Sequence, residues 1–248
     1  FIRIDRMQEE GCSVITKLID TGEVNGNVIK DSFPAENLAD PGNFTSLLYY
    51  FGLLTYDRME YGETIMKVPN LAVREQIYSY LVEAMKERES VVFPFMDLSD
   101  RMRRMAYFGE WEAALDFFAR QVDKKAVLRD VIYQESTIKT LMVAYMGLTD
   151  YFIIWPEFEA GRGFSDLYLM PNLANYPDMQ YSYLVELKFL KRDDTTTDVE
   201  ALLQEAEKQL RRYATDETIL SSTGNTRIRL LAAVYRGWQP EAMREFVL

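Results

Sequence analysis

Two strand-like runs carry charged residues at positions that a sheet would bury. The first run, residues 164–169, contains Asp166, and the second, residues 183–189, contains Glu186 and Lys188. Because strand side chains alternate between faces, Glu186 and Lys188 must share one face while the apolar residues around them point to the other. An acid and an amine in an apolar strand are costly unless the charges are paired or bind a ligand. The two runs therefore indicate a functional site as well as a sheet.

The stretch between these runs, residues 170–182, contains Pro171, Asn172 and Pro177 and predicts a long turn between antiparallel strands. Pairing of the two strands can bring Asp166 beside Glu186. Two carboxylates at close range repel each other unless a cation or a proton lies between them. With a lysine on the same face, the simplest interpretation is a hard divalent metal with oxygen ligands and an ammonium group beside it.

The order Glu135, Asp166 and Glu186-Leu187-Lys188, on a helix and two strands, resembles the PD-(D/E)XK nuclease superfamily. More narrowly, residues 161–169 and 183–188 are similar to the nuclease domain that follows an AAA-ATPase-like domain in a large bacterial family. The resemblance implies an α/β fold with a restriction-endonuclease-like core, in which a mixed sheet built in the order α-β-β-β-α-β is flanked by helices. It also implies a Mg²⁺ or Mn²⁺ cofactor and a DNA or RNA substrate.

The metal-site interpretation gives each motif residue a role. The metal would be held by Asp166, Glu186, Glu135 and the backbone carbonyl of Leu187. Lys188 orients the attacking water or helps to deprotonate it, while the metal stabilises charge in the transition state. As alternatives, Asp166 could cap the turn before it, and the acid and lysine of the second strand could form a surface salt bridge.

Glu135 lies in a predicted helix over residues 130–147, on the face that it shares with Ile138 and Met142. In the superfamily an acid on this helix completes the metal site, so the resemblance implies that Glu135 does so here. A helix cap or a salt bridge to a nearby arginine is the alternative. Gln134 takes the place of Glu135 if the helix phase is shifted by one residue.

Gln209 falls on the apolar stripe of a predicted helix over residues 198–214. Many members of the superfamily place a glutamine here, near the active site, and the resemblance therefore adds Gln209 to the catalytic set. A buried amide bonded to the backbone is the alternative.

The chain divides into two predicted modules. Residues 1–90 predict a helix over 5–20, a loop over 22–43, a short helix over 45–51, a hairpin from 53–56 and 64–68, and a helix over 71–86. This order favours a winged-helix-like module, and it resembles the C-terminal lid of the AAA-ATPase-like domain. Since no G-x-x-x-x-G-K-[ST] motif occurs, the nucleotide-binding core is expected upstream of Phe1. An adaptor module is the alternative for this part.

Residues 91–248 form the predicted nuclease-like domain. A helical stretch over 98–127 leads into it, and its core elements are a helix over 130–147, strands over 151–159, 164–170 and 182–190, a helix over 198–214 and a strand over 227–236. This order is that of the restriction-endonuclease-like core.

Composition narrows the chemistry. The chain of 248 residues contains no histidine, which excludes Ser-His-Asp and Cys-His catalysis and the usual zinc sites. Its single cysteine permits no internal disulfide. Because histidine is absent, hydrolysis must depend on carboxylates, lysine and metal.

No run approaches the roughly 18 apolar residues of a membrane span, so a cytoplasmic location is expected.

The net charge of −11 opposes broad attraction to nucleic acid. It favours an alternative function, a catalytically silent nuclease fold that serves as a binding or interaction module. A local basic strip could nevertheless bind phosphates, with a solvated helix face as its alternative interpretation. Its members are Lys188, Lys191, Arg192, Lys208, Arg211 and Arg212.

Overall fold

The computed structural model describes residues 14–15, 17–19, 21–26, 29–30, 43–89, 94–123, 135–160, 163–237 and 239–248. The chain separates into two compact units, Phe1–Val91 and Val92–Leu248. Within the described residues, no helix is both long enough and apolar enough to cross a membrane.

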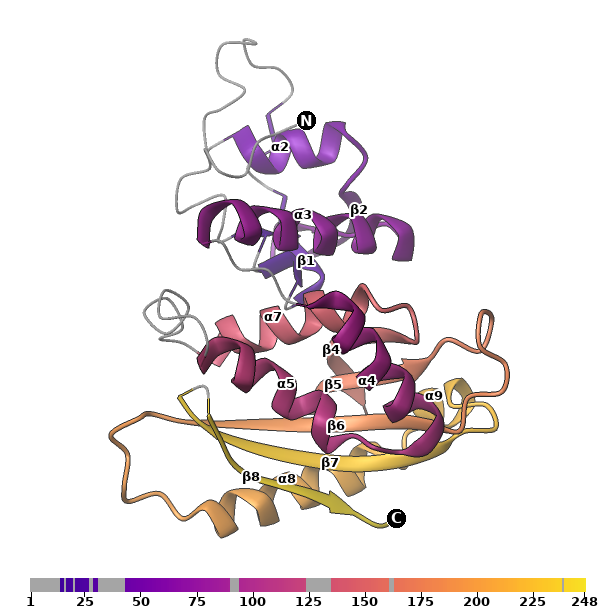
Figure 1. Cartoon of the computed structure of the whole chain (residues 1–248). Coiled ribbons are helices and arrows are strands. Elements are labelled where there is room, and N and C mark those ends of the chain that lie inside the picture. Colours follow the sequence, from indigo (N-terminus) through magenta and orange to yellow (C-terminus); the bar gives the residue numbers. More distant parts are fainter. Residues whose placement is uncertain are drawn as a thin grey trace. The chain divides into compact units, whose positions relative to one another are not determined.

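The first unit combines helices with a small antiparallel sheet (Figure 1). Its elements are β1 Glu23–Asn25, α2 Phe44–Tyr50, β2 Thr55–Glu60, β3 Glu63–Lys67 and α3 Leu71–Glu89, and the strand order is β1-β3-β2. Tyr61 and Gly62 form the two-residue turn between β2 and β3. Their φ values of 49° and 83° lie in the left-handed region, which this type of turn requires. The predicted hairpin and the helix that follows it are present.

One prediction for this unit is wrong. β1 lies within residues 22–43, which were predicted to be loop, and it pairs with β3 through Val24 and Met66. Both side chains are buried. A strand of three residues is too short to reveal alternation, and it is stabilised by pairing with a segment distant in sequence. The winged-helix-like character of this unit stays a prediction.

The second unit begins with helices α4 Phe95–Phe108 and α5 Glu112–Asp123. The helical stretch predicted over 98–127 is present in its described part as two helices, because the chain turns at Gly109, whose φ of 76° ends α4. The apolar stripe of α4 is fully buried and consists of Leu98, Met102, Met105 and Ala106. Helix α7 is described as Glu135–Gly147, and the predicted start at residue 130 falls in residues 124–134, which lie outside the described part.

A five-stranded mixed sheet forms the centre of the second unit. Its strands are β4 Phe152–Ala160, β5 Gly163–Pro171, β6 Tyr181–Leu190, β7 Arg227–Arg236 and β8 Gln239–Phe246, in the order β4-β5-β6-β7-β8. β6 and β7 are parallel, and the other neighbours are antiparallel. The parallel pair needs a crossover, which contains α8 Val199–Tyr213 and the short α9 Glu217–Ser222. The predicted α-β-β-β-α-β order is present, and α9 and β8 were not predicted.

Helices cover both faces of this sheet (Figure 1). α8 lies on one face, where Leu203, Leu210 and Tyr213 pack with Tyr168 and Leu184 in one buried cluster. α4, α5 and α7 lie on the other face, and the Tyr183 hydroxyl there donates to the Met105 carbonyl at 2.7 Å. Strand alternation therefore places Glu186 and Lys188 on the α8 face, next to Ala232 and Val234 of β7.

The pairing of β5 with β6 is short. It consists of three pairs, Leu167 with Val185, Tyr168 with Leu184 and Leu169 with Tyr183, although β5 begins at Gly163 and β6 continues to Leu190. By contrast, β6 pairs with β7 along its whole length. Asp166 and Glu186 come directly after the last β5–β6 pair, so the end of this ladder positions the site.

Candidate active site

Asp166 joins β5 to β6 where the ladder ends. Its Oδ2 accepts a hydrogen bond from the Leu187 backbone N–H at 2.8 Å. The carboxylate thereby takes a β6 donor at a point where β5 backbone no longer pairs with it. This contact fixes the Asp166 side chain beside the strand that carries Glu186 and Lys188.

Glu186 is a buried acid with an unused oxygen. Its side chain is 5% exposed, and Oε1 accepts from the Lys188 ammonium at 3.0 Å. Oε2 is buried and has no hydrogen-bond partner among the described residues. Burial, and then the charge of Asp166, raise the pKa of Glu186 to about 7, against the opposing effect of Lys188. This carboxylate would be stabilised by a further cation.

Lys188 is held by two elements. Its Nζ donates to Glu186 Oε1 on its own strand and to Gln209 Oε1 on α8 at 2.9 Å, and it lies 3.8 Å from Glu205 Oε1. Burial favours the neutral amine, but the neighbouring acids outweigh it and raise the pKa of Lys188. The ammonium therefore stays charged at neutral pH.

Lys139 of α7 is a site residue that sequence reasoning missed. Its side chain is 7% exposed, and Nζ donates to Asp166 Oδ1 at 3.3 Å and to Glu157 Oε1 at 3.0 Å. Burial lowers its pKa, but Asp166 and Glu157 outweigh this effect, so that the pKa of Lys139 is raised. Its position four residues after Glu135, on the same face of the predicted helix, was the available signal.

Glu157 supplies the other partner of Lys139 from an irregular point in β4. Its φ is 47°, in the left-handed region that non-glycine residues rarely adopt within a strand. In the β4–β5 register, Pro156 pairs with Leu167 and Phe158 with Ser165, so Glu157 falls opposite Asp166. The irregularity therefore lies at the site itself.

The structure brings four of the predicted site residues together: Asp166, Glu186, Lys188 and Gln209. Gln209 bonds to Lys188, not to backbone as its alternative interpretation had it. Leu187 contributes its N–H to Asp166, and the metal role of its carbonyl stays a prediction. Glu135 is the first residue of α7, one turn before Lys139; its side chain, like all of Gln134, lies outside the described part.

The donor set fits a hard divalent cation in chemical type. Carboxylate oxygens are the ligands such cations prefer, and the unpartnered Oε2 of Glu186 is available. Among the described side chains, no group of three or more acidic, histidine or cysteine residues lies close enough to form a complete metal-binding cluster. Asp166 and Glu186 thus provide two acids, and a third protein ligand would have to come from elsewhere.

One comparison with known proteins found a similarity that covers the sheet of the second unit. Residues 133–245 match the family model of the PD-(D/E)XK nuclease superfamily. The match spans α7, all five strands of the sheet and α8, and it implies the restriction-endonuclease-like α/β fold. No match was found among curated proteins or among solved structures.

Proposed function

We propose that the second unit is a metal-dependent nuclease that hydrolyses phosphodiester bonds in DNA or RNA. The observation that carries this proposal is Glu186, a buried carboxylate with a pKa of about 7 and an unpartnered Oε2 among the described atoms, bonded to Lys188. Such a group is costly for the fold unless a cation binds to it. The superfamily match over residues 133–245 supports the nuclease class.

Asp166 and Glu186 would hold Mg²⁺ or Mn²⁺, with Glu135 and the backbone carbonyl of Leu187 as further ligands. When bound, the metal supplies Lewis-acid stabilisation of the charge on the phosphoryl oxygens. The protein contributes the fixed position of its acids, because Asp166 is tied to β6 through the Leu187 N–H.

Lys188 would act on the water or on the developing charge. Its ammonium is charged at neutral pH and is held by Gln209, so it can orient the attacking water or balance negative charge in the transition state. Since the chain contains no histidine, the usual general base of hydrolases is excluded.

A cleavage assay on mixed DNA and RNA substrates tests this proposal. Activity should require Mg²⁺ or Mn²⁺ and should be lost with EDTA. Glu186→Gln should abolish cleavage by weakening metal binding, whereas Lys188→Ala should retain metal binding, measured by calorimetry, and lose most turnover. Normal metal binding without cleavage of any substrate would contradict the nuclease function.

The second candidate function is a catalytically silent binding module. The Lys139 ammonium favours it, because it already places an internal cation against Asp166. The net charge of −11 also favours it. Metal binding without turnover, even with an upstream ATPase-like domain restored, would be its signature.

We also propose that residues 1–90 act as the lid of an AAA-ATPase-like domain that lies upstream in the same bacterial, cytoplasmic polypeptide. The sequence resemblance supports this proposal. Nucleotide-dependent change in the cleavage rate of the longer protein would test it, and cleavage independent of ATP would contradict it.

A further inference from the structure

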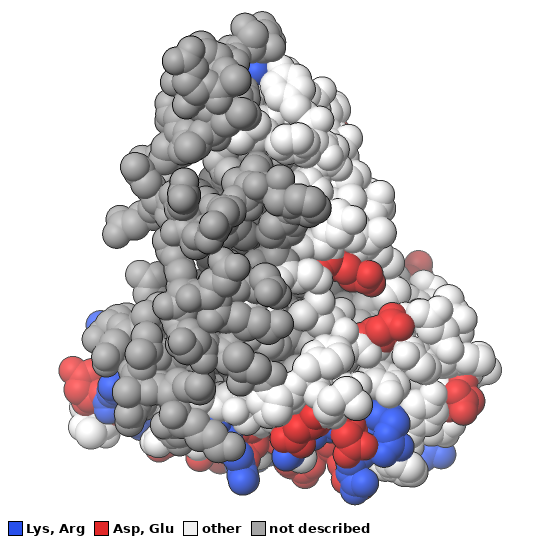
Figure 2. Space-filling model, turned by 45° about the horizontal axis from the view of Figure 1, so that its top comes forward, with Lys and Arg blue, Asp and Glu red and all other residues white. Residues whose placement is uncertain are grey.

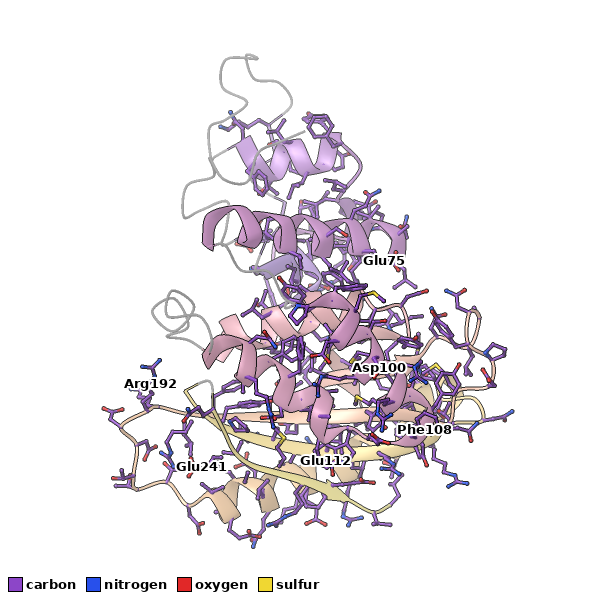
Figure 3. All side chains as sticks on the ribbon, in the orientation of Figure 1. Glu75, Asp100, Phe108, Glu112, Arg192 and Glu241 are labelled. Atoms are coloured by element: carbon purple, nitrogen blue, oxygen red, sulfur yellow. The ribbon has the colours of Figure 1, made fainter. Side chains whose placement is uncertain are left out.

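The basic strip predicted from the sequence is uneven in the structure. Lys188 belongs to the site, and Arg211 pairs with Glu207 at 2.7 Å and donates to the Val247 carbonyl. Arg192 projects from the loop after β6 (Figure 3). On the visible described atoms in Figure 2, blue side chains lie next to red ones and form no broad basic field. The members of the strip therefore differ in the contacts that they already make.

Arg212 is one member of this strip. It is exposed in the last turn of α8, its Nη2 donates to the Tyr213 hydroxyl at 3.2 Å, and its guanidinium carbon lies 5.1 Å from the centre of the Tyr213 ring. Within the described ranges, no aspartate or glutamate pairs with it. Its remaining N–H donors are available to a ligand.

Gly163 makes room for this arginine. A Cβ atom at Gly163 would lie 2.7 Å from Arg212 Nη2 and 2.9 Å from the Tyr213 hydroxyl oxygen. The φ of Gly163 is not positive, so the close approach of the guanidinium, and not backbone conformation, explains the glycine. The guanidinium is thus seated between the start of β5 and the end of α8.

The position of the Arg212 guanidinium, between Gly163 and Tyr213, lies beside the candidate active site. Gly163 is three residues before Asp166, roughly 10 Å along β5 at the usual rise of a strand. Gln209, which bonds Lys188, lies one turn before Arg212 on the same helix. A nucleic acid strand at the site carries a charge on each phosphate, and a guanidinium fits phosphate with two parallel hydrogen bonds.

We propose that Arg212, seated on Gly163 and Tyr213, binds a phosphate of the nucleic acid strand next to the phosphodiester that is cleaved. This inference rests on the proposed nuclease function. Arg212 is a substrate-binding residue and takes no part in the chemistry at the scissile phosphate.

The test compares Arg212→Gln with Arg227→Gln. Arg227 is exposed at the start of β7, pairs through its backbone with Tyr181 at the far end of β6 from Lys188, and has no acidic partner among the described residues. Arg212→Gln should weaken binding of short fluorescein-labelled DNA or RNA oligonucleotides roughly tenfold and reduce the slope of log affinity against log salt by about one. It should raise KM and leave kcat nearly unchanged. Arg227→Gln should do neither.

Gly163→Ala provides a second, independent variant. Its Cβ should displace the Arg212 guanidinium and weaken binding like Arg212→Gln, and the double variant should bind no more weakly than either single one. If the losses of binding free energy in the two single variants add fully in the double variant, Gly163 and Arg212 act independently, and the claim that Gly163 makes room for Arg212 is wrong. If Arg212→Gln lowers the melting temperature but leaves the salt slope unchanged, Arg212 only stabilises the C-terminal end of α8 through the helix dipole, and its phosphate-binding role is wrong.

Binding is measured with EDTA present, so it does not depend on cleavage. Equal behaviour of the Arg212→Gln and Arg227→Gln variants, or no binding of either oligonucleotide by the unaltered chain, would overturn the inference. If Arg212→Gln weakens binding but the unaltered chain cleaves nothing with Mg²⁺ or Mn²⁺, the nuclease proposal fails and the phosphate site stands.

Discussion

Glu186 and Asp194 are carboxylates of the same unit in opposite situations. Asp194, in the loop after β6, accepts hydrogen bonds from the backbone N–H groups of Thr196 and Thr197 and from both their hydroxyls, and these bonds hold its pKa well below the usual range. Glu186 is buried, its Oε1 accepts a hydrogen bond from Lys188, and its pKa is raised to about 7. Asp194 stabilises a turn, whereas Glu186 is the acid that we propose binds a cation.

The largest expected difference between these two acids is in metal affinity. Glu186→Gln should weaken Mn²⁺ binding at least about 100-fold, because it removes a charged ligand oxygen. Asp194→Asn should leave Mn²⁺ binding within experimental error. Calorimetric titration of both variants checks this prediction, and equal losses would mean that Glu186 has no special role.

Stability should move in opposite directions in the metal-free variants. The folded pKa of Glu186, about 7, lies above its ordinary value of 4.5, so its ionisation destabilises the fold as pH rises through this window. Glu186→Gln should therefore raise the free energy of unfolding by roughly 3 kcal/mol at pH 8 and by little at pH 4.

Asp194 has the opposite sign. Its folded pKa is lowered, so its contribution is present above the ordinary pKa of aspartate and is lost as pH falls toward the folded value. Asp194→Asn should destabilise the protein at neutral pH. Urea unfolding across this pH range measures both variants, and a Glu186→Gln variant less stable than the unaltered chain at pH 8 would contradict the comparison.

Lys139 allows a further test of the proposed metal site, because its ammonium already bonds to Asp166, the acid beside Glu186. Lys139→Met should lower the stability of the metal-free protein by roughly 2 kcal/mol, since it leaves Asp166 and Glu157 without their shared donor. Mn²⁺ should raise the melting temperature of this variant more than that of the unaltered chain. An equal rise would show that the ammonium and the metal do not act on the same carboxylate.

The smallest effect is expected at Gln209. Gln209→Leu removes one of the two short hydrogen bonds of the Lys188 ammonium and should lower kcat about tenfold with Mn²⁺ affinity unchanged. Gln204→Leu, an exposed change on the same helix, is the matched control. A change in metal affinity at Gln209 would mean that its amide acts on the metal and not on Lys188.

Much of the fold followed from the sequence where a pattern is long and regular. Alternation over residues 183–189 placed Glu186 and Lys188 on one face, and the helical stripe around Gln209 brought it to the same side. Prediction failed where tertiary contacts decide. β8 has little apolar alternation, since Pro240, Glu241 and Arg244 interrupt it, and it exists as a strand because β7 offers a partner.

The acids and the lysine of the site were predictable from the sequence, but Glu157 and Lys139, which contact them, were not. Pairing across the sheet predicted Asp166 beside β6, because both runs were recognisable as strands. The left-handed backbone of Glu157 depends on the β4–β5 register, and the Lys139 bridge depends on how α7 packs. Neither feature leaves a periodic signal in the sequence.

The most direct test of the central claim is a crystal of the chain soaked in Mn²⁺, with anomalous diffraction measured at a wavelength where manganese scatters. We expect an anomalous peak within ligand distance, about 2.0–2.6 Å, of an Asp166 oxygen and of Glu186 Oε2. Glu186→Gln crystals treated in the same way should lack the peak. A fully soaked crystal with no density at these two carboxylates, or with Lys139 and Lys188 still their only cations, would contradict the assignment of Glu186 as a metal ligand.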